Sequence, residues 1–556
     1  MATLRDLVTQ RIASALDAAF ASGALVTPDE AVLLPDIEIA RPQQAEHGDY
    51  ATNLALQLAG KLRKPPRDVA AALVEALAAS ADDPLVARAE VAGPGFVNLW
   101  LAPAHVEAAA DAIRSAGTQY GRSEAEHPLK INVEFVSANP TGPLTVGNAR
   151  GAFVGDLLSR VLEAAGHTIT REYYFNDSGS QVERLGQSVL AVRNGQPVAE
   201  DGYHGDYVKD LAESLPADVE GKALEDTAMG GWIVGEWASE QIRAGIERSL
   251  ANLGVRFDVW KSEGSLHTEG WVTQGVDRLR EAGQLYEQDG AQWFNSTAYG
   301  DDKDRVVYRS SGEPTYFASD IGYVVEKFSR GFDELIYVWG ADHHGTIARL
   351  HNAAQALGFD PDKVIVLLVA WVRFVVDGVE ASMSKRSGKF ITLDDLLAEV
   401  GPDAARWFFA SRAPSTGIDF DIELARKQSS ENPVFYVQYA HARISSILRK
   451  AADEGLAPAD SVAGGLADDP VALGLAKELL TLPDIVRDAA KERQTQAVTT
   501  FATELATTFH AFYRDRRVVD KDDPQTSATR LALVDATRVT LASALGLLGI
   551  SAPESM

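Results

Sequence analysis

The chain has 556 residues, of which 46% are hydrophobic, so it is long enough for three or four domains of about 100–200 residues each. Its 52 basic and 79 acidic residues give a formal net charge of −27, which argues against indiscriminate binding to nucleic acids or membranes but allows a local basic groove. It contains no cysteine, and this excludes disulfides, thiolate metal sites and a cysteine nucleophile.

The first 20 residues predict an amphipathic helix rather than a signal peptide, because charged residues interrupt them at helical spacing. The longest apolar stretch, VIVLLVAWV at 364–372, has about half the length that a membrane-spanning helix needs and predicts a buried strand. We therefore expect a cytoplasmic enzyme that does not bind membranes.

Residues 1–110 are expected to form an N-terminal domain that mixes helices and strands. The segment DVAAALVEALAAS has the spacing of an amphipathic helix, and VARAEVAG and GFVNLWL have the pattern of short strands. A polar connector, GTQYGRSEAEHP, follows this domain.

A catalytic domain is predicted over residues 111–425. The strand LKINVEFVS, an apolar helical stripe and the strand TITREYYF form a βαβ unit, which implies a parallel sheet. An acidic helical stretch at about 177–250 interrupts the pattern as an insertion, and alternation resumes with DELIYVW. After about residue 425 only helical runs remain, so residues 426–556 are expected to form an all-α bundle.

The turn SANPTGPLTVGNARGA at 137–152 has the features of an anion-binding helix start. A helix N-terminus presents unpaired N–H groups and the positive end of the helix dipole. Gly147 leaves room for a nucleotide, Pro143 stiffens the approach, and Thr145 and Asn148 offer neutral hydrogen-bond donors. Taken alone, such a turn is more often only a turn.

A second stretch, SMSKRSGK, follows a predicted hairpin at 373–382 and carries Lys385, Arg386 and Lys389. A solvated surface loop has the same composition. Together with the helix start, however, a distant cationic loop is what adenylyl transfer requires, because one holds the triphosphate and the other neutralises charge as pyrophosphate leaves.

These two stretches resemble the HIGH and KMSKS signatures of class I aminoacyl-tRNA synthetases, and their surroundings resemble the arginyl-tRNA synthetases. The resemblance covers nearly the whole chain, through HGDYATNLAL, AGPGFVNL, YYFNDSGSQ, FDVWKSEGS, TYFASDIG, VWGADHHG, YVQYAHARI and FHAFYRDRRV. It implies a Rossmann-like α/β catalytic domain with an α+β N-terminal domain that binds the tRNA D-loop and a helix-bundle domain that binds the anticodon.

The signatures depart from the family pattern. HIGH appears here as Thr145-Val146-Gly147-Asn148, so both histidines are replaced, and KMSKS keeps its second lysine, Lys385, but not its first. Family members without that second lysine tend to carry a lysine just before HIGH; here that position is Thr141, which is consistent with Lys385 retaining the role. We therefore expect a working site with neutral donors in place of the histidines.

The resemblance implies the reaction and its partners. L-Arginine and ATP, with Mg²⁺ bound to ATP, would form arginyl-adenylate and pyrophosphate, and the arginyl group would pass to tRNA(Arg). In this family activation usually requires bound tRNA, and the enzyme is commonly a monomer. The resemblance calls for neither an editing domain nor a structural metal.

A guanidinium pocket needs opposed carboxylates and a flat partner, because the group is planar and carries five donors. Tyr316 and Asp320 are spaced i, i+4 in TYFASD, so they are expected on one helical face, and Glu263 in KSEGS matches the family's second carboxylate. A lone Asp or Glu is more often a solvated surface residue. The motif context favours function here.

The resemblance also assigns residues to each role. The catalytic residues would be Thr145, Gly147, Asn148 and Lys385. ATP would contact Pro143, Val146, Gly147, Asn148, Gly340, Asp342, Met383, Ser384 and Lys385. Arginine would contact Glu134, Ser137, Asn139, Glu263, Tyr316, Asp320 and His344. The tRNA would contact Phe96, Asn98, Tyr439, Arg443 and Arg514.

Several alternatives remain. Asp342-His343-His344 invites a zinc site, but adjacent histidines point in different directions and no third ligand is near in sequence. A cysteinyl-type zinc synthetase is incompatible with the absence of cysteine, and a small nucleotidylyltransferase would leave the helical C-terminal part unexplained. A tRNA-binding relative that has lost activation is the rival of a different class, since both HIGH histidines are replaced.

Overall fold

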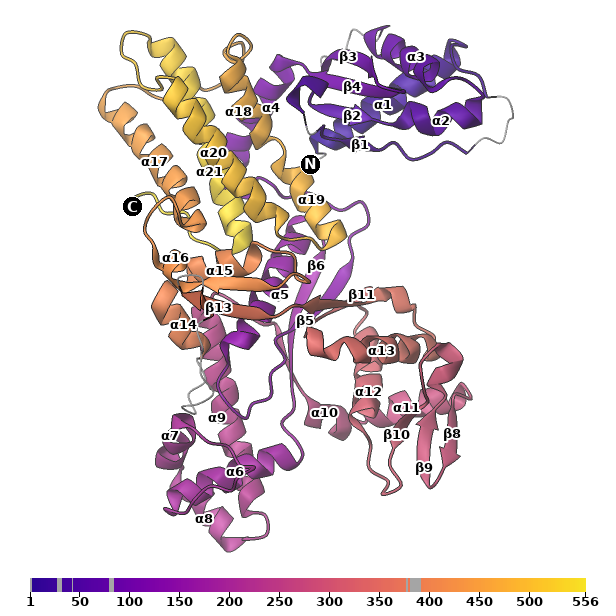
Figure 1. The fold of residues 1–556 in the computed structure, drawn as a ribbon, viewed down its shortest axis with the longest axis vertical. Helices are drawn as coiled ribbons and strands as arrows, with labels where there is room; N and C mark the ends of the chain where they lie inside the picture. The colour runs from indigo at the N-terminus through magenta and orange to yellow at the C-terminus, as the bar shows by residue number, and fades with distance from the viewer. Residues whose placement is uncertain (1–2, 28–32, 43, 80–84, 377–378, 381–391) are drawn as a thin grey trace.

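The structure is a computed structural model, and it describes residues 3–27, 33–42, 44–79, 85–376, 379–380 and 392–556. Figure 1 shows an N-terminal part at the upper right, a central parallel sheet, and a long helical bundle at the upper left. Two further lobes extend below the sheet, one helical and one that carries a small antiparallel sheet.

The N-terminal part is an antiparallel four-stranded sheet, in the order β1-β2-β4-β3, packed against helices. Side chains along β4 alternate, so that Val97, Leu99 and Leu101 are buried in the core while Phe96 lies on the opposite face. The elements are α1 (Leu4–Ala21), β1 (Ile39–Ala40), η1 (Ala45–His47), β2 (Tyr50–Thr52), α2 (Leu54–Leu62), α3 (Pro66–Ala79), β3 (Val86–Ala92) and β4 (Phe96–Leu101). The strands VARAEVAG and GFVNLWL are confirmed.

A connection made of α4 (Pro103–Ala116) and η2 (Gly117–Gln119) leads to a five-stranded parallel sheet in the order β12-β11-β5-β6-β7. Its strands are β5 (Lys130–Phe135), β6 (Thr168–Phe175), β7 (Val259–Ser262), β11 (Glu334–Gly340) and β12 (Val364–Val369). The helix α5 (Val146–Ala164) connects β5 to β6, as the sequence predicts, and its apolar stripe is buried. The predicted α/β fold class is confirmed.

Two long crossovers enlarge this sheet. The predicted helical insertion lies between β6 and β7 and consists of α6 (Ser180–Arg193), α7 (Asp206–Ser214), α8 (Ala217–Glu225) and α9 (Gly230–Asn252). A second lobe between β7 and β11 has its own hydrophobic core. It contains α10 (Glu263–Thr268), α11 (Trp271–Glu281), β8 (Leu285–Gln288), β9 (Ala291–Phe294), η3 (Ser296–Tyr299), β10 (Arg305–Tyr308) and α12 (Tyr316–Ser329).

After β12, the last strand of the parallel sheet in the sequence, the chain forms a second, smaller sheet. After β11 come η4 (Ala341–His343), α13 (His344–Ala356) and η5 (Pro361–Lys363), and after β12 a small sheet forms in the order β14-β13-β15. Its elements are β13 (Val372–Val376), β14 (Val379–Glu380), α14 (Leu393–Val400), α15 (Pro402–Ala410), β15 (Ile418–Asp421) and α16 (Ile422–Arg426). The antiparallel pairing of β13 with β14 confirms the predicted hairpin where it is described.

The C-terminal part contains only helices, as predicted: α17 (Pro433–Asp453), α18 (Pro470–Leu479), α19 (Leu482–Glu492), α20 (Ala497–Asp515) and α21 (Pro524–Leu548). By length and composition alone α21 could cross a membrane. However, 78% of its most apolar 18-residue window is buried, and it packs against α17, α18 and α20. It is therefore the central helix of the bundle.

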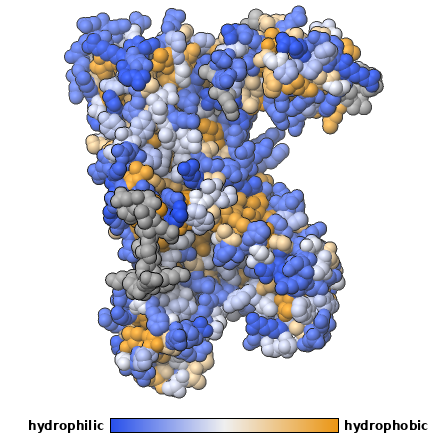
Figure 2. Space-filling model, viewed as in Figure 1, coloured by the Kyte–Doolittle hydropathy of each residue, from blue (hydrophilic) through white to orange (hydrophobic). Residues whose placement is uncertain are grey.

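Charged contacts hold the N-terminal part against α18 and α19. Both terminal nitrogens of Arg5 donate to Asp488 at 2.7 Å, and Lys477 Nζ donates to Asp49 at 2.8 Å. The face in Figure 2 is largely hydrophilic, in keeping with the high charge, and is hollowed between the N-terminal part and the lobe that carries β8–β10.

Candidate active site

The carboxyl ends of the parallel strands meet at one edge of the sheet. From β5 the chain proceeds through α5 to β6 on one side, whereas β11 pairs with β5 on the other side. In open parallel sheets, ligands bind in the crevice where the strand order reverses in this way. The turn at 137–152 follows β5, and the segment that begins at Gly340 follows β11, so both predicted ATP segments lie at this crevice.

The backbone leaves β5 in an uncommon conformation. Val136 has φ 69° and Ser137 has φ 43°, both in the left-handed region, where a β-branched residue such as valine is rare. The hydroxyl of Ser137 donates to Glu134 Oε1 at 3.1 Å and accepts from the backbone N–H of Tyr174 at 3.3 Å. Strain of this kind persists where surrounding contacts fix it, and here it turns the chain toward the candidate site.

The start of α5 is capped by the two residues that replace the HIGH histidines. Thr145 is the N-cap, and its backbone N–H and its hydroxyl donate to Asn148 Oδ1 at 3.1 and 2.9 Å. The hydroxyl of Thr145 therefore already donates its proton within the protein. The sequence analysis had treated this hydroxyl as a donor for the ligand. Asn148 Nδ2 and the N–H groups of Val146 and Gly147 make no hydrogen bond within the described chain, so they remain as donors. A Cβ at Gly147 would meet only Thr145 Oγ1, at 3.4 Å.

The first residues described after the predicted cationic loop lie beside this helix start. Met383, Ser384 and Lys385 lie outside the described residues. Seven residues after Lys385, Thr392 forms an antiparallel bridge with Thr145, and the N–H of Leu393 donates to the carbonyl of Leu144 at 2.9 Å. Thr392 also caps α14 through Asp395. Two stretches roughly 250 residues apart in the sequence therefore lie side by side at Thr145 and Thr392.

Arg150 makes a second link between α5 and the hairpin that leads to the loop. Its side chain is buried, and it donates to the carbonyls of Ala370 and Ala413, both at 2.9 Å. Burial lowers the pKa of this guanidinium to about 10. Because Ala370 lies two residues before β13, Arg150 links the start of the hairpin to α5. Sequence reasoning missed this residue.

Two predicted carboxylates, Glu263 and Asp320, come from different elements of the second lobe. Glu263 is the first residue of α10, and Asp177 fixes its neighbours by accepting from Ser262 Oγ at 2.6 Å and from the N–H of Gly264 at 3.1 Å. Burial raises the pKa of Glu263, against the opposing effect of a hydrogen bond from Tyr174, which the sequence analysis did not single out.

Asp320 lies in the second turn of α12. Burial, together with the charges of Glu263 and Glu134, raises its pKa to about 7, while Arg349 opposes them. The charges of the other two carboxylates therefore act on Asp320, although the three are far apart in the sequence. Tyr316 begins the same helix and is 68% exposed, so the predicted i, i+4 pair lies on one helical face.

Beneath the carboxylates lies a buried lysine. Lys327 Nζ donates to Glu134 Oε2 at 2.6 Å and lies 4.3 and 4.1 Å from the ring centroids of Tyr323 and Tyr337. Its side chain is 0% exposed. Ser137 donates to the other oxygen, Oε1, so each carboxylate oxygen of Glu134 already has a protein partner. The predicted contact between Glu134 and arginine would therefore use an oxygen that also accepts one of these bonds.

Glu172 forms a second buried pair next to the first. Arg330 donates to both its oxygens, at 2.7 and 2.9 Å, Asn132 donates at 2.9 Å, and the hydroxyl of Tyr323 donates as well. Sequence reasoning also missed this network. Its one signal was the pair of cations near the end of α12, Lys327 in its last turn and Arg330 at its C-cap.

The remaining predicted ligands lie around the crevice. Gly340 is close to Asp342, because a Cβ there would lie 2.5 Å from Asp342 Oδ1. Asp342 and His344 are exposed, and Asn139 donates to Gln181 of α6 at 3.1 Å. In the part of the chain that the structure describes, no group of three histidine, aspartate or glutamate side chains is placed to hold a metal ion.

The predicted tRNA contacts in the N-terminal part differ in exposure. Phe96 is 39% exposed, whereas Asn98 is only 6% exposed, although both lie on the same face of β4. Trp100 continues this face, and the guanidinium of Arg88 lies 3.6 Å from its ring centroid. An aromatic and a cation on one sheet face form a surface on which an RNA base can stack.

The predicted anticodon contacts lie together on α17 and α20. Arg443 lies 6.0 Å from the ring centroid of Tyr439 and 4.5 Å from that of Tyr513, and His510 lies 6.1 Å from Tyr439. Tyr513 and His510 belong to the segment FHAFYRDRRV, and the structure places them beside the predicted residues. Arg514 is exposed and paired with Asp515 at 2.8 Å.

Family models match almost the whole chain. The model of the arginyl-tRNA synthetase N-terminal domain matches residues 6–101. The model of the class I (R) tRNA synthetase catalytic domain matches 110–197 and 237–409, and that of the DALR anticodon-binding domain matches 437–556.

Individual relatives align with this chain over nearly their full length. An arginine–tRNA ligase of Moorella thermoacetica is 46% identical, covering 98% of this chain and 99% of the relative, and one of Geobacillus thermodenitrificans is 45% identical over 94% and 95%. The solved structure of the Thermus thermophilus arginyl-tRNA synthetase superposes with a TM-score of 0.77 over all of both chains, at 24% identity, and so shares the fold. The family models and these full-length relatives show that the chain belongs to the arginyl-tRNA synthetase family of class I.

Proposed function

We propose that the chain is an arginine–tRNA ligase, which activates L-arginine with ATP and transfers it to the 3′ end of tRNA(Arg). The observation that carries this proposal is the carboxylate pair of Glu263 and Asp320 beside an anion-binding helix start. Burial is the main cause of the raised pKa of both groups, so their ionised forms are disfavoured until a cation binds beside them. A guanidinium is the cation whose planar fork suits two carboxylates.

In this proposal Asp320 and Glu263 bind the guanidinium, and Tyr316 provides the flat partner. Ser137, Asn139 and His344 line the path toward the α-phosphate. Glu134 acts through its shared bonds with Ser137 and Lys327. An uncharged analogue would leave two buried carboxylates without a cation, so selectivity arises in the pocket without an editing step.

Activation requires positioning rather than a covalent nucleophile. A carboxylate oxygen of arginine attacks the α-phosphorus in line, the new O–P bond forms, and the bond to pyrophosphate breaks. Asn148 and the N–H groups of Val146 and Gly147 hold the phosphates, with Pro143 and Thr145 shaping the turn. Lys385, with Met383 and Ser384, neutralises the departing pyrophosphate, while Gly340 and Asp342 contact the ribose.

Mg²⁺ enters this scheme with ATP. It prefers phosphate oxygens and water to an all-protein cage, which suits a site where no described triad of ligands exists. The ion would supply charge neutralisation on the phosphates. The residues that face the phosphates are Asn148 and the start of α5.

For tRNA, we propose that the N-terminal domain over 1–110 contacts the D-loop through Phe96 and Asn98, and that the domain over 426–556 contacts the anticodon. The second contact would use Tyr439, Arg443 and Arg514. The catalytic domain would span 111–425, with the insertion at about 177–250. The protein would act as a cytoplasmic monomer.

The first test is arginine-dependent exchange of pyrophosphate into ATP, with and without tRNA(Arg). We expect exchange with arginine and not with lysine or citrulline, and a large stimulation by tRNA. This result would show that Thr145 and Asn148 suffice in place of histidines. Absence of exchange in a folded protein that still binds tRNA would contradict the catalytic proposal and favour a binding-only relative.

Arginine binding should depend on pH near neutrality. The pKa of Asp320 is about 7 in the free protein, and a bound guanidinium favours the ionised carboxylate, so protons are released on binding. One pH unit below that pKa the ionised fraction falls to roughly a tenth, and KM for arginine should rise about tenfold between about pH 8 and pH 6. KM for ATP, measured in parallel, is the internal control, and a flat arginine profile would contradict the assignment.

A further inference from the structure

The helical insertion begins beside the arginine pocket that the proposed function assigns. Its first helix, α6, follows β6, whose neighbour in the parallel sheet is β7. Glu263 is the first residue after β7, and Asp177 is the second residue after β6, so both lie at the carboxyl ends of adjacent parallel strands. The proposed function gives no role to Asp177 or to α6, and the inference drawn from them rests on that function.

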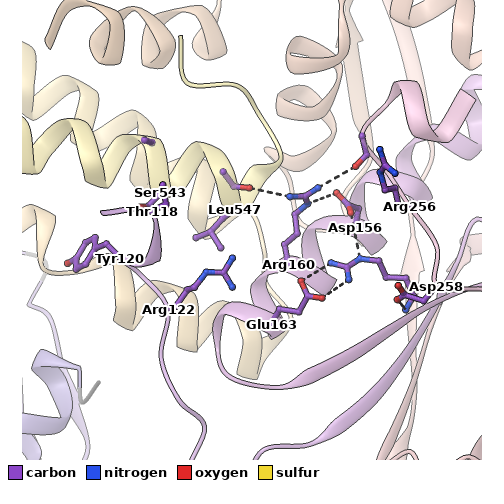
Figure 3. Close-up of a pocket in the computed structure, with 14 residues that line it drawn as sticks. Thr118, Tyr120, Arg122, Asp156, Arg160, Glu163, Arg256, Asp258, Ser543 and Leu547 are labelled. Carbon is purple, nitrogen blue, oxygen red and sulfur yellow. Dashed lines mark hydrogen bonds and ion pairs between the residues drawn. The ribbon is translucent and has the colours of Figure 1, made fainter. Parts of the chain in front are cut away.

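Strands β6 and β7 are held together at their other end. The backbone N–H of Arg171 donates to Asp258 Oδ2 at 2.8 Å, and the N–H of Asp258 donates to the carbonyl of Arg171 at 2.9 Å. The guanidinium of Arg171 donates to both oxygens of Glu163 of α5, at 2.6 and 2.9 Å. Figure 3 shows Glu163 and Asp258 in the wall of a cavity at this end. The strand pair is therefore a fixed base for the residues that follow its carboxyl ends.

Asp177 holds both chain neighbours of Glu263. Its Oδ2 accepts from Ser262 Oγ at 2.6 Å, and its Oδ1 accepts from the backbone N–H of Gly264 at 3.1 Å. The approach is close, because a Cβ at Gly264 would lie 3.2 Å from Asp177 Oδ1. Both donors are neutral. Asp177 therefore fixes the backbone around Glu263 and supplies no positive charge that would compete with a guanidinium.

Four residues later, Gln181 of α6 contacts another predicted ligand of arginine. Its Oε1 accepts from Asn139 Nδ2 at 3.1 Å, so the amide of Asn139 is oriented with its nitrogen toward α6. Asn139 is exposed, and its Oδ1 makes no hydrogen bond with any described residue. An ammonium group has donors only, so a free carbonyl oxygen suits the α-amino group of arginine.

Other contacts fix the insertion against both signature segments. The hydroxyl of Tyr207 of α7 donates to the carbonyl of Thr141, in the turn at 137–152, at 2.9 Å. Ser249 Oγ of α9 donates to Asp394 of α14 at 2.5 Å. The insertion therefore contacts both segments that converge at the start of α5, and α6 is the part of it that reaches the predicted arginine ligands.

We propose that Asp177 and Gln181 are positioning residues for arginine, each acting through one predicted ligand. Asp177 sets the place of Glu263 at the guanidinium end, and Gln181 sets the orientation of the Asn139 amide at the α-amino end. Both belong to one short segment, 177–181, so this segment fixes how far apart the two ends of the pocket lie. Such support from a second layer of residues holds the groups that touch the substrate in their productive geometry.

The test measures binding of L-arginine and of its desamino analogue, which has hydrogen in place of the α-amino group, by calorimetry on the full chain. Asp177→Ala should raise both Kd values about tenfold, because both ligands carry the guanidinium. Gln181→Met keeps the size of the side chain but not its acceptor, and it should raise the Kd of arginine about fivefold and leave that of the analogue unchanged. A general disturbance of the fold would weaken both ligands in both variants.

Gln187→Met is the matched control, because Gln187 is an exposed glutamine of the same helix that contacts Glu183 and not the turn at 137–152. It should leave both Kd values unchanged. Asp177→Asn keeps the size of the side chain and one acceptor oxygen, so it should fold as the unchanged protein does and raise both Kd values less than Asp177→Ala. Equal losses for the two ligands in Gln181→Met, or unchanged Kd values in the variants of Asp177, would overturn the proposal.

Pyrophosphate exchange by the unchanged protein separates this proposal from the proposed function. The calorimetric test requires binding only. Arginine binding without exchange would contradict the proposed activity while the Kd values of the variants still decide the positioning roles. Absence of arginine binding to the unchanged protein would overturn both.

Discussion

Replacing Asp320 by asparagine should lower kcat/KM for arginine by about two to three orders of magnitude, because it removes one partner of a desolvated charge pair. The side chain keeps its size but loses the charge that the guanidinium requires. KM for ATP should stay close to that of the unchanged protein, since Asp320 belongs to α12 and not to the signature turn. Steady-state exchange kinetics at varied arginine and at varied ATP separate the two effects.

The same substitution should not cost stability. Asp320 has its pKa raised to about 7, so above that pH its ionised form is less favourable in the folded than in the unfolded protein. Asparagine removes this cost, and the midpoint of thermal unfolding at about pH 8 should stay equal or rise. A lower midpoint together with equal losses for both substrates would assign Asp320 a structural role. Asp342→Asn is the matched control and should raise KM for ATP alone.

Much of the sheet could be predicted because its strands are short, apolar and followed by helices. TITREYYF and DELIYVW coincide with β6 and β11 almost to the residue. The positions of Tyr316 and Asp320 on one helix also followed from local spacing, since an i, i+4 pair needs only that the segment be helical. Local rules therefore predicted these strands and the shared helical face, whereas the role of the pair stays a prediction.

Contacts between distant segments could not be predicted. The bonds of Arg150 to the carbonyls of Ala370 and Ala413 involve backbone atoms, which leave no trace in side-chain patterns. The small sheet β8–β10 consists of four-residue strands with many exposed positions, so the alternation that marks a strand is weak. The hydrogen bonds between Thr145 and Asn148 depend on the N-cap conformation of Thr145. The comparison with the HIGH signature treated both residues only as replacements for histidines and so did not predict these bonds.

Replacing Lys327 by methionine should be the most destabilising single change at the site. It leaves the buried carboxylate of Glu134 without its cation, and breaking a buried pair in this way costs about 3–5 kcal/mol. Urea unfolding followed by tryptophan fluorescence should show the loss. The variant should regain stability as the pH falls, because an unpaired Glu134 is more stable when protonated.

The double variant Glu134→Gln/Lys327→Met distinguishes charge from packing. With the carboxylate neutral, no buried charge is left unpaired, so most of the lost stability should return. A double variant as unstable as the single one would show instead that Lys327 acts through its contacts with the rings of Tyr323 and Tyr337. If stability returns while arginine-dependent exchange stays low, the charge of Glu134 serves substrate binding beyond its structural pair, as expected for a carboxylate that also raises the pKa of Asp320.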